Sequence, residues 1–532
     1  MKRIKLLLLA IAWLFTACSG GSADGNQPLN KPPVLHNTPP DTTSLPPTTT
    51  TLLTGASASS QPLTPVQQTA SDPVRNALTP TATILPATVT AAQPQSPTPS
   101  PSPPSPGRTR YRLSAVLDYP QQHLKVDQEI IYANQSGQTL SELLFVVEPN
   151  RWEDVFRLEK ITLADGSAPN DVILDGERLW LLLPVPLGPG DMTGLSFSYS
   201  IHIPRYPGPL SYTGRQTNLG DWYLFLPPYI PGQGWLIHDP AAAGEHLVYE
   251  VADFLVDIQV LDPPDGLQAA ASALVEREGN RYRYRLDAAR SFAWSASPEY
   301  QVLAGSTSGG VQVTGYVFPE HSGAGSAALA TTLQAVELYS ELFGPYPRTS
   351  LAFVEADFFD GMEYDGLYFL GREYYAEYSG SLKSYLVALS AHETAHQWWY
   401  AAVGNDPALE PWLDEALCVY SEALYYERYA PDLISWWWNF RVNRFSPDGS
   451  VGSTIYDHDN FRSYVNAVYL RGALFFEDLR RYAGDQRFLT ILSEHFSENL
   501  HQLATTDQFF ARLEQSLPGE IDFLLQRYFN YP

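Results

Sequence analysis

The segment 391–400 reads AHETAHQWWY and places His392, Glu393 and His396 in the spacing HExxH. On a helix, residues four apart lie on the same face, so the two imidazoles can bind one metal ion. Zinc favours nitrogen ligands of this kind, and a catalytic zinc site keeps one position open for water. Glu393 follows the first histidine directly, where a carboxylate can take a proton from that water. The pattern predicts a hydrolytic metal centre.

A simpler interpretation of the motif is a surface helix that carries two histidines and a glutamate without a function. The residues around the motif argue against it. Such a helix is expected to be polar around the motif. The segment is instead rich in apolar side chains, which is typical of a core element: Tyr385, Leu386, Leu389, Trp398 and Trp399. The core interpretation is therefore favoured.

A third ligand follows in Glu415, which eighteen residues separate from His396. Because proline suits the first turn of a helix, a second helix is expected to begin near Pro411, after a turn at 404–407. If that helix packs antiparallel to the first, Glu415 can face the two histidines. Two histidines and a glutamate, with water, form an established catalytic zinc set.

With these residues in place, the chain resembles the gluzincin metallopeptidases of the aminopeptidase N type, the family that includes leukotriene hydrolase. Two further segments carry the resemblance. Residues 361–364 (GMEY) resemble part of the GxMEN motif of that family, and residues 469–473 (YLRGA) resemble its Y-x-[KR]-G-A segment. The resemblance covers about residues 108 to 532.

The resemblance implies that one zinc ion per chain is bound by three side chains, those of His392, His396 and Glu415. It implies that Glu393 is the general base and that Tyr469 donates a hydrogen bond to the oxyanion of the reaction. Glu363 is implied to hold the α-amino group of the substrate. The backbone near Gly361 and Met362 is implied to line the bound peptide.

The chain departs from the motifs of the family at a few positions. Asp360 stands where GxMEN begins with glycine, and Tyr364 replaces its asparagine. The family also uses a second acidic or amide group from the N-terminal domain to hold the amine. Gln216 and Asp221 lie in a plausible stretch for that role, and the choice between them stays open.

The expected fold is α+β and multidomain. Short runs of alternating polarity, such as 111–116 and 123–132, predict strands separated by Gly- and Pro-rich turns. Together with the resemblance, they predict a β-rich saddle or sandwich domain over 108–305. A thermolysin-like α/β zinc peptidase domain is expected over 306–532. Larger members of the family carry a further helical domain over the site; here it is expected to be absent or short, which predicts a more open cleft.

The first hundred residues have a different composition. Residues 1–18 join a short basic region to an apolar run that ends at Cys18, which is typical of a signal peptide with a lipobox-like end. The alternative is an ordinary signal peptide cleaved near Ala17. Residues 19–107 are rich in Pro, Thr and Ser, which predicts a disordered stalk, with or without O-linked glycans. We therefore expect export and a lipid anchor on the outer face of a bacterial cell membrane.

Charge and cysteine content narrow the classes of partner. The formal net charge of −25 argues against nucleic acid as a partner. The chain contains two cysteines, so a lipidated Cys18 leaves Cys418 unpaired. We expect Cys418 to be a small buried residue of the second site helix; a thiol that modulates the metal is the alternative.

The most economical function is that of a zinc-dependent aminopeptidase that cleaves extracellular peptides from their amino ends. An endopeptidase of the same fold is a second hypothesis, favoured if the amine site is weak. An inactive, surface-anchored binding protein is a third, but it predicts the loss of a ligand or of the base, and the sequence retains all of them. The sequence does not predict an oligomeric state.

Overall fold

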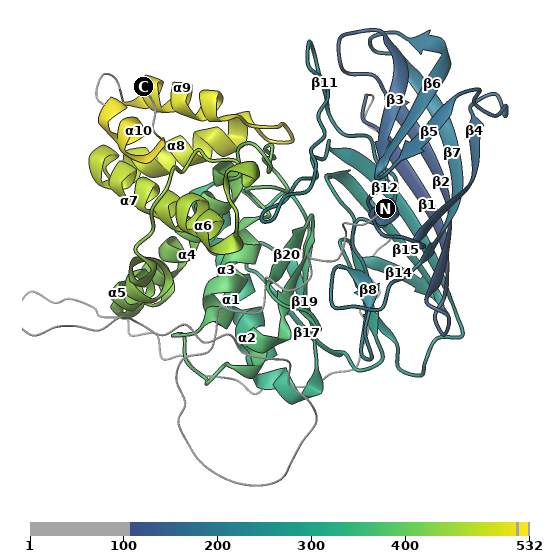
Figure 1. Cartoon of the computed structure of the whole chain (residues 1–532). Helices are drawn as coiled ribbons and strands as arrows, with labels where there is room; N and C mark the ends of the chain where they lie inside the picture. Colours follow the sequence, from purple (N-terminus) through teal and green to yellow (C-terminus); the bar gives the residue numbers. More distant parts are fainter. Residues whose placement is uncertain (1–106, 518–520, 530–532) are drawn as a thin grey trace, which may run out of the picture. The chain divides into compact units, whose positions relative to one another are not determined.

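The computed structural model describes residues 107–517 and 521–529. The predicted signal peptide, Cys18 and all but the last residue of the predicted stalk lie outside the described residues. Strands fill the first part of the described chain and helices predominate from α1 onward (Figure 1), which confirms the predicted α+β fold. None of the helices described there combines the length and the apolar character that a membrane span requires.

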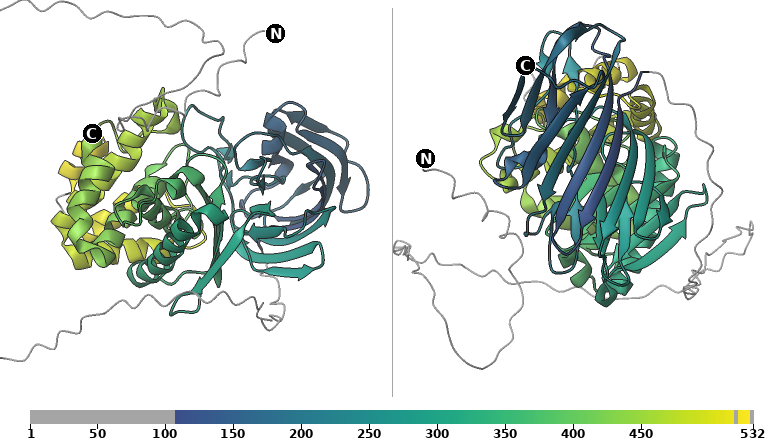
Figure 2. Two further views of the ribbon diagram at one scale, coloured as in Figure 1. Left: turned by 90° about the horizontal axis from the view of Figure 1, so that it is seen from below. Right: turned by 90° about the vertical axis from the view of Figure 1, so that its right-hand side faces the viewer.

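A seven-stranded sheet dominates the N-terminal region, in the order β14-β15-β12-β1-β2-β7-β4. Strand β1 pairs in parallel with β12 and antiparallel with β2. Buried and exposed residues alternate along β1 and β2, so one face of the sheet covers a core. Figure 2 shows the long strands of this sheet side by side. Their bounds are Arg110–Asp118 (β1), His123–Ala133 (β2), Phe156–Leu163 (β4), Met192–His202 (β7), Ala252–Leu261 (β12), Val275–Glu278 (β14) and Arg281–Ala289 (β15).

Smaller sheets complete this region. Strands Leu140–Val146 (β3), Arg178–Leu187 (β6) and Val172–Asp175 (β5) form a three-stranded sheet. A four-stranded sheet has the order β13-β16-β9-β8. Its members and those of a short hairpin are Gln268–Ala271 (β13), Trp294–Ser297 (β16), Thr217–Leu219 (β9), Leu210–Tyr212 (β8), Tyr229–Ile230 (β10) and Gly234–Trp235 (β11).

A five-stranded sheet supports the helical region, in the order β17-β18-β19-β21-β20. Its first strand begins at Gln301, slightly before the boundary expected from the sequence, and pairs with β18. Strand β20 lies at the edge and runs antiparallel to β21. The strands are Gln301–Ser306 (β17), Gln312–Val317 (β18), Ser350–Ala356 (β19), Gly361–Tyr364 (β20) and Leu367–Gly371 (β21).

The α-helices are Ser322–Leu342 (α1), Arg372–Ala376 (α2), Tyr385–Ala395 (α3), Trp412–Tyr429 (α4), Ile434–Trp437 (α5), Phe461–Tyr464 (α6), Arg471–Ala483 (α7), Asp485–Glu498 (α8), Thr506–Ser516 (α9) and Asp522–Phe529 (α10). Two π-helical segments interrupt them, Trp438–Val442 (η4) and Val465–Leu470 (η7). Short 3-10 turns are Glu148–Arg151 (η1), Pro319–His321 (η2), Pro431–Leu433 (η3), Asn443–Phe445 (η5) and Ile455–Asp457 (η6).

The beginning of α4 is held by aromatic packing. The fully buried ring of Trp412 contacts five phenylalanines of the C-terminal helices, namely Phe475, Phe476, Phe509, Phe510 and Phe529. Trp412 Nε1 also donates to Thr506 Oγ1. Since aromatic pairs stabilise beyond their buried area, these helices fix the position of Glu415, three residues further along α4.

Candidate metal centre

The metal centre is built on α3 and the first turns of α4. Ser384 caps the beginning of α3, where its hydroxyl accepts a hydrogen bond from the amide of Val387, and every residue from Leu386 to Ala395 is buried. The helix is buried on all sides because it packs against both α1 and α4 in the core. Its last turn carries His392 and ends at His396.

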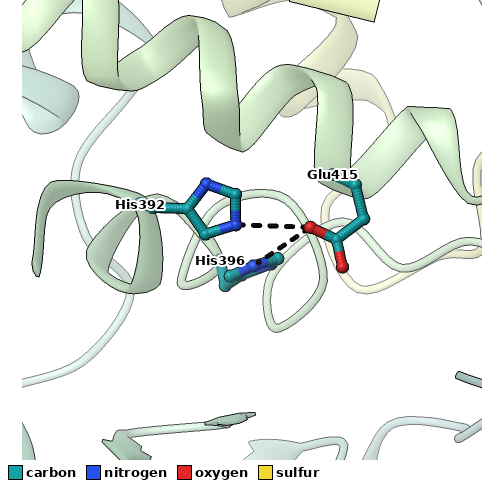
Figure 3. A group of neighbouring side chains, drawn as sticks. All are labelled: His392, His396 and Glu415. Carbon is teal, nitrogen blue, oxygen red and sulfur yellow. Dashed lines mark hydrogen bonds and ion pairs between the residues drawn. The ribbon is translucent and has the colours of Figure 1, made fainter. Parts of the chain in front are cut away.

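The three predicted ligands meet at one point (Figure 3). His392 Nε2 lies 3.3 Å from Glu415 Oε2, and His396 Nε2 lies 3.7 Å from the same oxygen. Tetrahedral zinc with bonds of about 2.0–2.2 Å separates its ligand atoms by about 3.4 Å. All three side chains are buried. The donor set and its spacing therefore fit a zinc ion.

Carboxylates behind the histidines orient both rings. His392 Nδ1 lies 3.1 Å from Glu422 Oε1, and His396 Nδ1 lies 2.6 Å from Asp414 Oδ1. Such outer carboxylates hold the opposite ring nitrogen toward a metal. Glu422 lies seven positions after Glu415, on the same face of α4. The sequence analysis did not single out Asp414 or Glu422, although that helical spacing was visible.

The carboxylate of Glu422 is itself held by hydrogen bonds from Arg441 and Trp437. Arg441 donates to its carboxylate through Nε and Nη2, at 3.0 Å for the closest contacts, and Trp437 Nε1 donates at 3.1 Å. The Arg441 side chain comes from the π-helical segment η4. Burial raises the pKa of Glu422, but Arg441 and His392 outweigh it and the pKa is lowered.

Negative charge exceeds positive charge around the ligands. Burial alone lowers the pKa of His392, yet its hydrogen bonds to Glu415 and Glu422 raise the pKa above its ordinary value. Burial also raises the pKa of Glu393 to about 8. A group of buried carboxylates that favours cationic neighbours in this way is a fitting environment for a divalent cation.

Glu393 points toward the edge strand β20. Its Oε2 is buried and has no hydrogen-bond partner among the described residues. A Cβ built on Gly361 would lie 1.9 Å from Glu393 Oε1, so the backbone of β20 passes directly beside this carboxylate. The structure thus leaves one carboxylate oxygen of Glu393 available for a ligand that the protein itself does not supply.

Tyr469 reaches the same centre from the π-helical segment η7. Its ring is nearly parallel to the imidazole of His392, with 6.2 Å between ring centres, and its hydroxyl lies close enough to the carboxylate of Glu415 to influence the pKa of that group. Burial and the charge of Glu415 raise its pKa well above the usual value, so the phenol keeps its proton. π-Helical turns often occur at functional sites because they redirect a side chain.

Glu363 lies on the other side of His396, with 3.8 Å between Glu363 Oε1 and His396 Nδ1. That oxygen is buried and has no hydrogen-bond partner among the described residues. Burial raises the pKa of Glu363 well above its usual range. Met362, its half-buried neighbour on β20, packs against a buried apolar cluster that includes Phe358 and Phe369.

A second carboxylate beside Glu363 comes from Glu245, on the loop between β11 and β12. Burial raises the pKa of Glu245, and the next largest cause is the charge of Glu363. The loop packs tightly against Ile455 and Tyr464, because a Cβ on Gly244 would lie 2.4 Å from Ile455 and 2.9 Å from Tyr464. No sequence motif marks Glu245, and the sequence analysis missed it.

Gln216 and Asp221, the two candidates for a second amine-binding group, are engaged elsewhere. The Gln216 amide bonds to the hydroxyl of Tyr300, the carbonyl of Glu355 and the backbone of Asp357. Asp221 accepts hydrogen bonds from the hydroxyls of Tyr249 and Tyr364.

The departures from the motifs have structural reasons. Tyr364 stands at the position of the asparagine of GxMEN, and its hydroxyl donates to Asp221 at 2.9 Å. Asp360 stands at the position of the first glycine and has φ of +72°, a left-handed conformation that glycine adopts freely and aspartate tolerates.

Cys418 is fully buried on α4. Its sulfur lies 3.9 Å from both Asp414 Oδ1 and the carbonyl of Trp399, and burial raises the pKa of the thiol well above its usual value. These are the properties of a small core residue, because a reactive thiol needs an exposed, electropositive setting.

Comparison with known proteins agrees with this geometry. Residues 327–528 match a family model described as the Peptidase family M1 domain. The chain carries a domain of peptidase family M1. This confirms the resemblance to the aminopeptidase N-type gluzincins, a family that implies zinc at the centre formed by α3 and α4.

Similar sequences occur among plant proteins. Aminopeptidase M1-D and Aminopeptidase M1-B of Oryza sativa subsp. japonica are 27% and 28% identical over 235 and 231 residues. Each match covers 41% of this chain, and the chain spans only 26% of the length of either rice protein.

The fold of this chain is also found in solved structures. The M1 zinc metallopeptidase from Deinococcus radiodurans matches with a TM-score of 0.57 and 18% identity, over 79% of this chain and 92% of that one. A variant of the same enzyme, solved with a Tyr-Ser-Ala substrate, matches with a TM-score of 0.56 over 93% of its length. At this identity the likeness establishes the two-domain fold.

Proposed function

We propose that the chain is a zinc-dependent aminopeptidase with one zinc ion per chain. The observation that carries the proposal is the pair Glu363 and Glu245, a buried and a half-buried carboxylate next to a centre formed by His392, His396 and Glu415. The Glu363 carboxylate has an oxygen that no described residue satisfies. A substrate ammonium group would offset part of the charge of the two acids and donate the missing hydrogen bonds.

The chemistry follows from the positions of the remaining groups. Bound zinc supplies a Lewis acid that polarises the scissile carbonyl and acidifies a water molecule. Glu393 takes a proton from that water and passes it to the leaving amine. The Tyr469 hydroxyl donates a hydrogen bond to the oxyanion that develops on the substrate carbonyl; loss of such a donor elsewhere costs about 3 kcal/mol.

Two carboxylates near the amine favour exopeptidase over endopeptidase activity. A peptide bond in the middle of a chain would place an uncharged backbone against Glu363 and Glu245, and both acids would stay unpaired in a buried site. The inactive binding protein is disfavoured because the candidate ligands, base and oxyanion donor are present and gathered together. The Deinococcus radiodurans structure with a bound tripeptide supports a peptide as the substrate.

The composition of residues 1–18 supports export and an anchor at Cys18, and hence extracellular peptides as substrates. Peptides with a free amino end are the natural ligands of a site that ends in two carboxylates.

The test is hydrolysis of two fluorogenic panels by the purified full chain, one with free amino groups and one with the same peptides N-acetylated. We expect zinc-dependent cleavage of the free-amine panel, loss of activity in a chelator, and recovery when zinc is added. The Glu393→Gln variant should keep its zinc and lose activity. Cleavage of the acetylated panel would favour the endopeptidase. If neither panel is hydrolysed although zinc is bound, the binding protein would be favoured.

A further inference from the structure

Three arginines gather near the beginning of α3, and only one of them has a carboxylate partner. Arg441 is neutralised by Glu422. Within the described part of the chain, no carboxylate lies within 4 Å of Arg444 or Arg462 (compare the ion pairs of Arg428, Arg480 and Arg512). The chain has 58 acidic residues and 33 Lys and Arg, so two adjacent arginines without an acid are not explained by a shortage of partners.

The two guanidinium groups are held in place by aromatic rings. The ring of Phe445 lies between them, with Arg444 Cζ at 4.5 Å and Arg462 Cζ at 4.4 Å from its centre. Arg444 also lies 4.3 Å from the ring centre of Phe440 and donates to the hydroxyl of Tyr385. Stacking of this kind stabilises an arginine and leaves its N–H groups free at the edge of the guanidinium plane.

Arg444 is exposed, but the setting of Arg462 is unfavourable for a cation that stays alone. Arg462 is half-buried, and burial lowers its pKa; Arg441 and Arg444 lower it further, and Tyr385 opposes them. Arginine nevertheless remains charged in proteins. An anion placed between Arg444 and Arg462 would relieve this repulsion and accept hydrogen bonds from both.

The pair and the amine-binding carboxylates lie at opposite ends of α3. Tyr385, which contacts Arg444, is the first residue of the helix, and His392 is two turns later on the same face, about 10 Å along the axis. Glu363 lies beside His396, beyond the other end of the helix. The metal ligands therefore lie between a site for a cation and a site for an anion.

We infer that Arg444 and Arg462 bind the free α-carboxylate of a short peptide whose amino end is held by Glu363 and Glu245. The inference rests on the proposed function, because it takes the direction of the peptide from the amine site. An extended chain advances about 3.3 Å per residue, so about three residues after the scissile carbonyl span the roughly 10 Å along α3 between His392 and Tyr385, the residue that Arg444 contacts. Tetrapeptides are therefore the best ligands, and peptides with an amidated carboxyl end lose the contact.

The experiment measures binding, so that it does not depend on turnover. The zinc-loaded full chain with Glu393→Gln is titrated calorimetrically with alanine tri-, tetra- and pentapeptides, each as the free acid and as the C-terminal amide. We expect the tetrapeptide acid to bind about tenfold more tightly than its amide, as one charge-assisted contact in a half-exposed site allows. Arg444→Gln and Arg462→Gln, added separately, should abolish this difference and leave the affinity for the amide unchanged.

Arg487→Gln, which removes an exposed arginine on α8, serves as the matched control and should keep the preference. Thermal unfolding and zinc content of each variant show whether it is folded and loaded. Equal affinity of acid and amide in the parent, or a preference that survives both substitutions, overturns the inference. Hydrolysis of aminoacyl fluorogenic substrates, which have no carboxyl end, separately tests the proposed function.

Discussion

The α-carbon of Gly361 lies against the carboxylate of Glu393. A Cβ at this position would lie 1.9 Å from Glu393 Oε1 and 2.6 Å from Cδ, much closer than any real contact. An added Cβ would therefore displace the Glu393 carboxylate, and glycine allows the backbone of β20 to lie directly beside the proposed base. Strand β20 also carries Glu363, so one short strand positions both acids.

The substitution Gly361→Ala should lower kcat by about a hundredfold, because a displacement of the base by about 1 Å has an effect of that size. Zinc content should not change, since the three ligands lie on α3 and α4. Stopped-time assays on a free-amine substrate, together with metal analysis of the same samples, measure both quantities. Gly323→Ala is the control, because a Cβ there meets nothing within 4 Å. Unchanged kcat in Gly361→Ala would show that Glu393 tolerates the shift.

The Arg441–Glu422 pair should contribute to stability and to metal binding in separable ways. Arg441→Met leaves the fully buried Glu422 without its cation, which typically costs about 3–5 kcal/mol of unfolding free energy. It should also weaken zinc binding about 10- to 100-fold, because Glu422 orients His392. Chemical unfolding in a chelator measures the first effect, and competition with a chromophoric chelator measures the second.

The double variant Arg441→Met with Glu422→Gln distinguishes the two effects. It removes the uncompensated charge, so most of the unfolding free energy should return. Zinc affinity should stay low, because a neutral amide orients the imidazole less strongly than a carboxylate does. Restoration of both quantities would mean that Glu422 acts on the fold alone.

The metal ligands could be predicted from the sequence because their spacing is a property of local structure. His392 and His396 share a helical face, and Glu415 lies in the first turns of the next helix, after a single connecting turn. Short-range geometry therefore brings the three together. Glu245 could not be predicted in this way. It precedes Glu363 by a whole set of strands and reaches the site on a loop whose path depends on packing against Ile455 and Tyr464.

The same limit applies to the residues that support the site. Arg444 and Arg462 belong to different short helical segments and meet through the ring of Phe445, a contact that no periodicity marks. Gln216 had the right residue type and a suitable region, yet its amide connects β9 to β19 through backbone hydrogen bonds. Residue type and region were therefore insufficient where tertiary contacts decide.

Glu245→Gln should raise KM for substrates with a free amino group about tenfold and change kcat little, because the amide still accepts a hydrogen bond but loses its charge. Cleavage of N-acetylated substrates, if any is detectable, should not fall. Steady-state kinetics on both panels measure the effect. Glu276→Gln, at an exposed position on β14, is the control. Equal losses on free and acetylated substrates would assign Glu245 a structural role instead.

Asp221 should make the stability of the fold depend on pH. Burial raises its pKa in the folded chain to about 6, while an unfolded chain has a value of about 3.9. Between these values the folded state retains a proton that the unfolded state has lost, so stability decreases as pH rises from about 4 to about 6. The decrease attributable to this group is about 3 kcal/mol, and it is complete above pH 6.

Asp221→Asn removes the titrating group and should flatten the dependence of stability on pH in this range. The stability of the variant relative to the wild type should therefore increase as pH rises from about 4 to about 6. Unfolding by urea at closely spaced pH values, in a chelator so that metal loss does not contribute, measures the difference between the two chains. Tyr249→Phe provides a matched test, because the Tyr249 hydroxyl lowers the pKa of Asp221 and its removal should extend the window to higher pH. Parallel profiles for the wild type and Asp221→Asn between pH 4 and 6 would show that Asp221 ionises in the folded chain as readily as in the unfolded one.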